Sequence, residues 1–297
     1  MTVVCTTSTF DAELPEQFTV FGNPHGRRLT EEEVIELLRR HRPQGLIAGV
    51  EPLTRRAMES DPELRVISRC GVGLDNVDLD SARDLGILVC TTPTAPVESV
   101  AELTVGLMLA ALRSIPQADA AIRRGEWPRT GGNLLGGKTV GLVGCGRIGS
   151  AVASLLAAFG CPLLGYDPMV RDHGRCVMVT LDELLEQSDI ISLHAPLTRT
   201  TARLIDEAAL ARMKPGALLV NTARGGLVDE AALVHALERG IIAAAALDVF
   251  DAEPYGGPLV GMTDRTVLTS HIGAAAREAR AAMEAEAVLN LVAALTR

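Results

Sequence analysis

The 297-residue sequence predicts an α/β protein made of two doubly wound parallel-sheet domains. Three observations lead to this prediction. Short apolar segments alternate with helical patterns along the chain, ten such segments exceed the usual size of one sheet, and a glycine-rich turn lies near the middle. Such alternation is typical of parallel strands joined by helices. We therefore expect one domain to be inserted into the other.

The expected strands are short and rich in Val, Ile, Leu and Ala, as in strands that are buried on both faces. In chain order they are Thr2–Cys5, Gly45–Ala48, Val66–Ser68, Leu88–Cys90, Thr139–Val143, Pro162–Tyr166, Ile190–Leu193, Leu218–Asn221, Ala243–Leu247 and Val267–Thr269. The expected helices repeat apolar residues at helical spacing. They include Glu31–His41, Leu53–Glu59, Val97–Arg113, Ile148–Phe159, Leu181–Gln187, Asp206–Arg212, Glu230–Arg239 and Arg277–Ala294.

The domain boundaries are expected at two crossings. The first is the proline-containing segment Thr92-Pro93-Thr94-Ala95-Pro96, and the chain returns after His271-Ile272-Gly273. Residues 94–273 then form the inserted domain, and residues 1–93 with 274–297 form the other. We expect the helix from Val97 to bridge the domains and the last helix to pack on the first domain.

Composition excludes several classes of protein. Hydrophobic residues make up 47% of the chain, and the net charge of −9 with 28 dispersed basic residues argues against a nucleic-acid partner. The six cysteines form neither a CxxC pair nor a metal-ligand spacing with histidine, which predicts reduced thiols and no metal. The uncharged run 148–166 is interrupted by Gly160 and Pro162 and coincides with an expected helix and strand, so we expect no membrane span. The N-terminus lacks a signal-peptide pattern, and we expect a cytoplasmic protein.

The segment Gly144-Cys145-Gly146-Arg147-Ile148-Gly149 follows an apolar strand and opens an apolar helix. Its first glycine allows a tight turn, its second lets backbone approach a pyrophosphate, and its third lets the helix pack closely on the strand. Asp167, at the end of the next strand, suits the ribose hydroxyls and would repel a 2′-phosphate. The motif therefore predicts a Rossmann domain that binds NAD rather than NADP.

Three further polar residues follow strand ends, where an open α/β sheet places its ligand crevice. Arg224 lies in Asn221-Thr222-Ala223-Arg224-Gly225-Gly226, Glu253 follows the strand that ends at Leu247, and His271 follows Thr269. A guanidinium fork suits a carboxylate. If Glu253 and His271 meet, the carboxylate orients the imidazole and stabilises its protonated form, which suits acid/base catalysis.

The chain resembles the D-isomer-specific 2-hydroxyacid dehydrogenases over nearly its whole length. The resemblance rests on Ser68 to Asp78, the glycine loop with Tyr166-Asp167-Pro168, Asn221 to Asp229, Leu247 to Pro254, and His271-Ile272-Gly273-Ala274. It implies a flavodoxin-like substrate domain, the inserted Rossmann domain, and a homodimer formed through the NAD-binding domain. The only tryptophan, Trp127, would lie near the dimer contact.

The resemblance also implies roles for individual residues. Arg224, Glu253 and His271 match the catalytic set, and Arg69, Gly71, Val72 and Gly73, with Arg224 and His271, match the substrate site. Besides the glycine-loop residues Gly144, Gly146, Arg147, Ile148 and Gly149, the residues expected to contact NAD are Val72, Asp167, Ala195, Thr222, Ala223, Asp248 and Gly273. His271 would take the proton of the 2-hydroxyl, while Arg224 and the Gly71–Gly73 amides would hold the carboxylate.

Within the family, the chain is most similar to the phosphoglycerate branch, which implies NAD-dependent oxidation of D-3-phosphoglycerate to 3-phosphohydroxypyruvate in serine biosynthesis. The arginine expected there after the second strand is missing from Leu46-Ile47-Ala48-Gly49-Val50-Glu51, whereas Arg69, Arg55 and Arg56 remain nearby. Glu51 would oppose an anion if it faced the cleft. The alternatives are a reductase of glyoxylate, hydroxypyruvate or a phosphonate analogue, and an NAD-sensing corepressor. Because the chain ends at Arg297, we expect no C-terminal regulatory domain.

Overall fold

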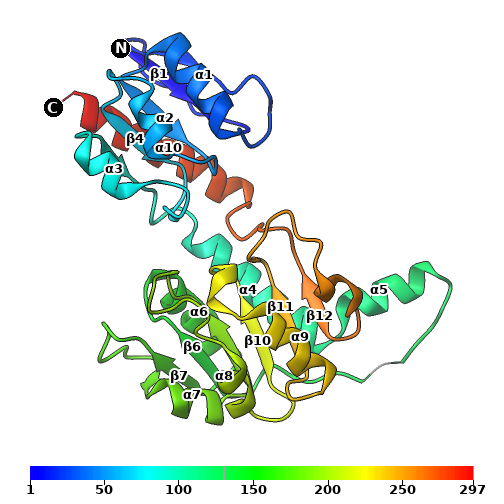
Figure 1. The fold of residues 1–297 in the computed structure, drawn as a ribbon. Coiled ribbons are helices and arrows are strands. Elements are labelled where there is room, and N and C mark those ends of the chain that lie inside the picture. Colours follow the sequence, from blue (N-terminus) through cyan, green and yellow to red (C-terminus); the bar gives the residue numbers. More distant parts are fainter. Residues whose placement is uncertain (130, 297) are drawn as a thin grey trace. The chain divides into compact units, whose positions relative to one another are not determined.

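The computed structural model describes residues 1–129 and 131–296. The chain divides into two compact units (Figure 1). Unit 1 comprises Met1–Pro96 and Ala274–Arg297, and unit 2 comprises Val97–Gly273. The second unit is therefore an insertion into the first.

Unit 1 contains a five-stranded sheet in the order β2-β1-β3-β4-β5, and every neighbouring pair is parallel. This order is the flavodoxin-like one. The strands are β1 (Thr2–Cys5), β2 (Thr19–Phe21), β3 (Gly45–Ala48), β4 (Val66–Arg69) and β5 (Leu88–Cys90).

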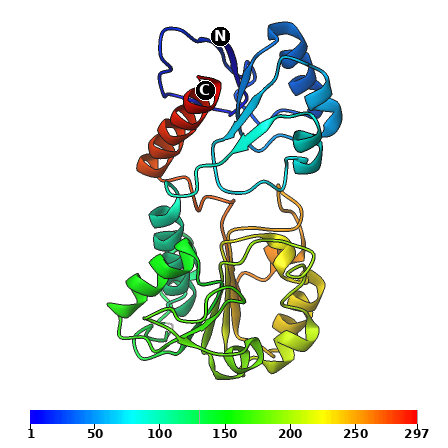
Figure 2. The ribbon, with the colours of Figure 1, turned by 90° about the vertical axis from the view of Figure 1, so that its left-hand side faces the viewer.

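Helices cover both faces of the unit 1 sheet. They are α1 (Glu31–His41), α2 (Arg55–Glu59), α3 (Leu79–Asp84) and α10 (Arg277–Leu295). Residues of α1, α2 and α3 form one apolar cluster with alternate strand residues, and α10 forms the second on the opposite face (Figure 2). The absence of a side chain at Gly45 lets α10 approach, since a Cβ there would lie 2.8 Å from Leu291 Cδ1. The expected packing of the last helix on the first domain is confirmed.

Unit 2 contains a seven-stranded parallel sheet in the order β12-β11-β10-β9-β6-β7-β8, which is the Rossmann order with one extra strand. The strands are β6 (Val140–Val143), β7 (Leu163–Tyr166), β8 (Val177–Met178), β9 (Ile190–Leu193), β10 (Leu218–Asn221), β11 (Ala244–Leu247) and β12 (Thr266–Leu268). The helices are α4 (Val97–Leu112), α5 (Ile115–Arg123), α6 (Arg147–Ala157), α7 (Leu181–Gln187), α8 (Glu207–Arg212) and α9 (Glu230–Glu238), with short 3₁₀ turns η1 (Gly225–Leu227) and η2 (Pro258–Gly261).

Alternation along the central strands places apolar side chains on both faces of this sheet. In β10, Leu218 and Val220 pack with α4 and α6, whereas Leu219 packs with α7, α8 and α9. Successive strand residues point to opposite faces, so a strand covered on both sides is apolar throughout. This explains the continuous apolar runs in the sequence, and the predicted α/β class with doubly wound sheets is confirmed.

The structure adds four regular elements that the periodicity did not predict. Strands β2 and β8 are edge strands of three and two residues, too short for a periodic pattern to show in the sequence. Helices α3 and α5 span six and nine residues. Helix α2 begins at Arg55 instead of Leu53, because Thr54 is its N-cap and its side chain accepts from Ala57 N.

Within the described residues, no single helix is long and apolar enough to cross a membrane. Helices α4 and α5 together reach the required length and composition, but they are bent by 63°. Helix α4 also contributes Val105, Leu107 and Met108 to the buried core of unit 2.

Candidate functional site

The glycine loop joins β6 to α6 in unit 2. Gly144 has φ +98°, and a Cβ there would lie 2.7 Å from the carbonyl carbon of His194. A Cβ on Gly149 would overlap Gly144 O, whereas one on Gly146 would meet nothing within 4 Å. The first and third glycines therefore serve packing within the protein, and the second leaves open space for a ligand.

The start of α6 suits an anion. Gly146 is its N-cap, and no side chain caps the helix there. The first turn of a helix presents unpaired N–H groups and the positive end of the helix dipole. These features fit the pyrophosphate of NAD, with Arg147 and Ile148 in the first turn.

Asp167 ties the glycine loop to the end of β7. Its Oδ2 accepts from Cys145 N at 2.9 Å, and its Oδ1 accepts from Met169 N at 2.8 Å. Each carboxylate oxygen can accept more than one hydrogen bond, so ribose hydroxyls still have acceptors here. The carboxylate is thus held in place by backbone before any ligand binds.

The other expected NAD contacts of unit 2 also follow the carboxyl ends of its strands. Ala195 follows β9, Thr222 and Ala223 follow β10, Asp248 follows β11 and Gly273 follows β12. Since the strands are parallel, their carboxyl ends share one edge of the sheet. Val72 lies in unit 1.

Arg224 is positioned by a turn that Asn221 organises. The buried Asn221 side chain donates to Arg224 O at 2.8 Å and accepts from Ala223 N at 3.0 Å. The guanidinium Nη1 of Arg224 donates to Ala223 O at 2.6 Å. A Cβ on the following Gly225 would overlap the Phe250 carbonyl, so the glycine lets this turn pack on the Glu253 loop.

Glu253 and His271 lie in hydrogen-bonding contact. Glu253 Oε2 lies 2.8 Å from His271 Nδ1, and the other oxygen, Oε1, accepts from Phe250 N at 3.1 Å. The imidazole is about half exposed, with a side-chain exposure of 47%. A carboxylate on Nδ1 orients the ring and leaves Nε2 for proton exchange. We call these residues the Glu253–His271 pair.

Asp248 holds the turn that carries His271. Its buried carboxylate accepts from Ile272 N at 2.9 Å, Gly273 N at 2.8 Å and Thr269 Oγ1 at 2.6 Å. Its backbone carbonyl accepts from His271 N, and His271 has the left-handed φ of +54°. The expected contact of Asp248 with NAD remains a prediction, whereas the structure shows this residue holding the turn from Thr269 to Gly273.

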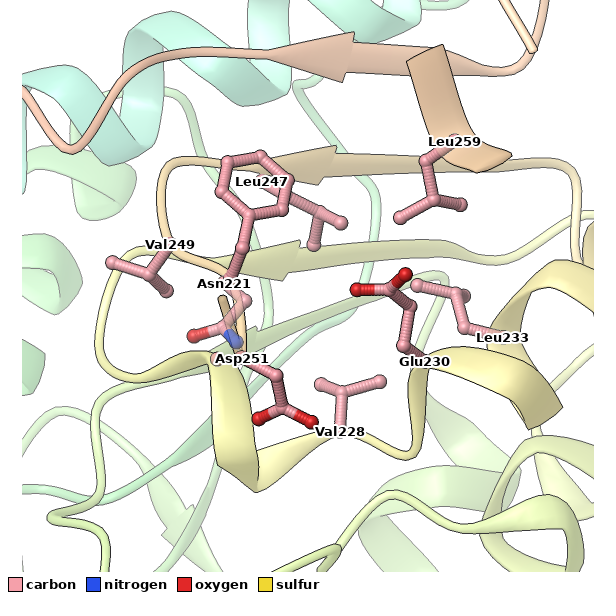
Figure 3. Close-up of a pocket in the computed structure, with 10 residues that line it drawn as sticks. Asn221, Val228, Glu230, Leu233, Leu247, Val249, Asp251 and Leu259 are labelled. Carbon is pink, nitrogen blue, oxygen red and sulfur yellow. The ribbon is translucent and has the colours of Figure 1, made fainter. Parts of the chain in front are cut away.

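The loop that carries Glu253 is braced by an aromatic stack. The rings of Phe250 and Tyr255 lie 4.1 Å apart at 17°, and Tyr255 Oη donates to Glu230 Oε1 at 2.8 Å. Burial raises the pKa of Tyr255 to about 12. A cavity of about 10 Å³ lies beside this brace, with Glu230 and Leu259 on its lining (Figure 3). A cavity of this size accommodates no more than a single water molecule and no substrate.

His194 lies directly below the glycine loop. Its Nε2 lies 2.9 Å from Ser192 Oγ, and its buried Nδ1 has no hydrogen-bond partner among the described residues. Desolvation by burial lowers the pKa of His194 from 6.5 to about 4. The imidazole is therefore neutral in the folded protein at physiological pH.

The desolvated imidazole of His194 should make stability depend on pH. The unfolded chain protonates His194 below pH 6.5, whereas the folded chain does so only near pH 4, so the free energy of unfolding falls as pH falls through this window. The loss should reach about 2 kcal/mol at pH 5 and about 3 kcal/mol below pH 4. Urea unfolding of the wild type and His194→Asn at pH 7.5 and 5 checks this, with the exposed His235→Asn as control. An equal pH dependence in wild type and His194→Asn would contradict it.

In unit 1, Arg69 is the last residue of β4, and the loop that follows contains Gly71, Val72 and Gly73. The Gly71 amide, expected to bind a substrate carboxylate, instead donates to Thr92 Oγ1 at 2.8 Å. This leaves the Val72 and Gly73 amides for a ligand. The Arg69 guanidinium lies against Gly71 and donates to Cys70 O.

Glu51 does not oppose an anion at this edge of unit 1. Its side chain is buried and accepts hydrogen bonds from Gly49 N at 2.9 Å and from Thr6 Oγ1. Asn76 Nδ2 donates to Glu51 O at 2.6 Å. The carboxylate therefore stabilises the loop after β3.

A depression of about 520 Å³ lies nearby and is lined in part by Arg28, Asp75 and Asp78. The carboxylates of the two aspartates make it a poor site for an anion.

Sequence reasoning missed Asn221, Tyr255 and His194 as supporting residues. Asn221 ends β10, His194 follows β9 and Tyr255 lies beyond β11, and nothing in the sequence around them indicates the contacts that they make. Among residues 1–129 and 131–296, no three His, Cys, Asp or Glu side chains lie together as metal ligands.

Known proteins are similar to this chain in sequence and in fold. Residues 105–273 match the profile of the D-isomer specific 2-hydroxyacid dehydrogenase, NAD binding domain. D-3-phosphoglycerate dehydrogenase of Mycobacterium tuberculosis is 45% identical over 241 residues, which are 79% of this chain and 46% of that protein. Glyoxylate reductase of Thermofilum pendens is 44% identical over 275 residues, 88% of this chain and 81% of that protein. The crystal structure of TT0316 protein from Thermus thermophilus superposes with a TM-score of 0.88 at 38% identity, covering 100% of this chain and 97% of that one.

The fold and the glycine loop define an NAD-binding protein of the Rossmann class. The chain belongs to the D-isomer-specific 2-hydroxyacid dehydrogenase family. It spans about half the length of the mycobacterial relative.

Proposed function

We propose that this protein oxidises D-3-phosphoglycerate to 3-phosphohydroxypyruvate with NAD, the first step of serine biosynthesis. The observation that carries the proposed chemistry is the 2.8 Å contact of the Glu253–His271 pair beyond the carboxyl ends of the NAD-binding sheet. The similarity to phosphoglycerate dehydrogenase supports the choice of substrate.

In the proposed reaction, His271 Nε2 takes the proton of the C2 hydroxyl, and Glu253 stabilises the resulting imidazolium. Arg224 binds the carboxylate and polarises the C2 oxygen. The Val72 and Gly73 amides assist in carboxylate binding. Bound NAD supplies the acceptor for the hydride that leaves C2.

The proposed phosphate ligand is Arg69. Its guanidinium lies at the start of the substrate loop, and the Glu51 carboxylate is buried in hydrogen bonds with Gly49 N and Thr6 Oγ1 and is not exposed at this edge. A guanidinium fork binds phosphate oxygens in pairs. Arg69 would thus replace the arginine that is missing after β3.

A second candidate is reduction of glyoxylate, hydroxypyruvate or a phosphonate analogue by the same residues. This candidate is favoured because the segment Gly49-Val50-Glu51 has no arginine at the place where the phosphate-binding arginine was expected. The 44% identity to a glyoxylate reductase also favours it. The same catalytic pair serves either direction, because His271 returns the proton during reduction.

The deciding experiment compares substrates and an Arg69 variant. NADH formation at 340 nm is measured with D-3-phosphoglycerate, D-glycerate and D-lactate, and NADH oxidation with the 2-keto acids. Arg69→Gln should lower kcat/KM for D-3-phosphoglycerate at least tenfold and leave D-glycerate nearly unchanged. Arg65→Gln, at the residue just before β4, is the control.

The outcomes separate the candidates. Activity with glyoxylate or hydroxypyruvate but not with D-3-phosphoglycerate would support the second candidate. Binding of NAD with no turnover of any acid would support an NAD-sensing corepressor-like protein.

For an enzyme of small-molecule metabolism with reduced thiols we propose a cytoplasmic location.

We also propose that the chain forms a homodimer through unit 2. Helix α5 and the segment after it expose Ile115, Ile122, Trp127 and Leu134, with Trp127 79% exposed. Such a cluster is typical of a protein contact.

Trp127→Ala should weaken this dimer about 30-fold, which corresponds to the roughly 2 kcal/mol that a buried indole contributes to association. Sedimentation velocity across a concentration series measures the effect. Met169→Ala, which removes another exposed apolar side chain of unit 2, should leave the dimer intact. A wild type that is monomeric at micromolar concentration would contradict the proposal.

A further inference from the structure

Two thiols meet beneath the glycine loop of unit 2. Cys145 lies between Gly144 and Gly146, and Cys176 lies just before the edge strand β8. A Cβ on Gly165 would lie 2.9 Å from Cys145 Sγ and 3.1 Å from Cys176 Cβ. The missing side chain at Gly165 therefore leaves the space in which the two thiols come together.

The two buried side chains are close enough to affect each other's ionisation. Interaction with the Cys176 thiol, together with burial, raises the pKa of the Cys145 thiol, whose Sγ donates to Leu142 O at 3.9 Å. The same interaction lowers the pKa of Cys176. Because the thiolate is the nucleophile, we assign the first attack to Cys176, which is also the more exposed of the two.

Cys176 lies closer to solvent than Cys145 does. Its residue exposure is 8%, compared with 4% for Cys145. The next residue, Val177, is 66% exposed on the two-residue strand β8. Cys176 thus lies one residue from solvent at the sheet edge, whereas Cys145 lies under the loop.

We propose that Cys145 and Cys176 form a redox site, which a hydroperoxide oxidises to a disulfide that weakens NAD binding. The Cys176 thiolate attacks one peroxide oxygen, which gives a sulfenic acid and, with hydrogen peroxide, one water. The Cys145 sulfur then displaces the sulfenic hydroxyl as a second water. Two thiols lose two electrons and two protons, and the peroxide is reduced to two waters.

The effect on NAD follows from the position of Cys145. A disulfide brings two sulfurs to about 2.05 Å, far inside their nonbonded distance, so the side chain of Cys145 must move toward β8. Its own amide holds Asp167 Oδ2 at 2.9 Å, and its neighbours are two glycines of the loop. Oxidation therefore displaces the Asp167 carboxylate, which is expected to bind the ribose, together with the glycine loop, which is expected to bind the pyrophosphate.

The test uses the full chain, either reduced with dithiothreitol or treated with hydrogen peroxide that is then removed by catalase. Peptide mapping detects the disulfide, and NADH fluorescence titration gives the Kd. We expect a Cys145–Cys176 disulfide, a Kd raised at least tenfold, and recovery after dithiothreitol. Cys176→Ser should bind NADH as the reduced wild type does and should not respond to peroxide.

The control is Cys161→Ser, which removes a buried thiol of the same unit that bonds Leu135 O at 3.4 Å. This variant should respond to peroxide as the wild type does. If Cys176→Ser does not fold, Cys176→Ala replaces it. A mapped disulfide with unchanged Kd, or loss of NADH binding by peroxide in Cys176→Ser as well, would overturn the proposal.

Discussion

His271→Asn should lower kcat about 10²–10⁴-fold, the usual contribution of a general acid/base, and leave the Kd for NADH within about twofold. Asparagine is the sharper replacement because His271 has φ +54°, a backbone conformation that asparagine tolerates better than alanine. The turn held by Asp248 is thereby preserved. The loss then reports on the imidazole alone.

The measurement is steady-state kinetics on the best substrate, together with NADH titration. The control is His235→Asn, which changes an exposed histidine of α9 in the same unit. Glu253→Gln should produce a smaller loss, because the imidazole stays in place but its protonated form loses a 2.8 Å carboxylate partner. A fully active His271→Asn enzyme would rule out His271 as the acid/base.

The sequence predicted those parts of the site in which a local physical constraint permits only one type of residue. Gly144 and Gly149 could be assigned because a side chain at either position would overlap the backbone. The buried strands could be assigned because double coverage by helices makes them apolar throughout, as in β10. Such constraints act locally and remain visible in the sequence.

Other features depended on distant residues and left no local pattern. From the sequence alone, Glu51 would be expected to be an exposed acid. In the structure it is buried and accepts a hydrogen bond from Thr6, 45 positions away. The Gly71 amide reads as a ligand donor until Thr92 is found to accept from it. The edge strand β8 carries only two residues, yet it brings Cys176 to the glycine loop. Tertiary contacts decide each of these cases.

Substitutions of two glycines in the loop should separate a loss of stability from a loss of NADH binding. Gly149→Ala should lower the free energy of unfolding by about 1–3 kcal/mol, since its methyl group overlaps Gly144 O and forces α6 away from β6. Gly146→Ala should leave stability nearly unchanged, because its φ is −74° and its Cβ meets nothing within 4 Å. Both variants should bind NADH poorly, but for different reasons.

Gly146→Ala is therefore the more informative variant. Its methyl group fills the space into which the pyrophosphate must come, so the Kd for NADH should rise at least 30-fold while urea unfolding matches the wild type. Gly106→Ala, in the core helix α4, where a Cβ also meets nothing within 4 Å, is the matched control and should bind NADH normally. If Gly146→Ala binds NADH like the wild type, the pyrophosphate does not lie against this glycine. In that case the first turn of α6 cannot be its binding site, because a ligand held by those N–H groups has to pass within contact distance of Gly146.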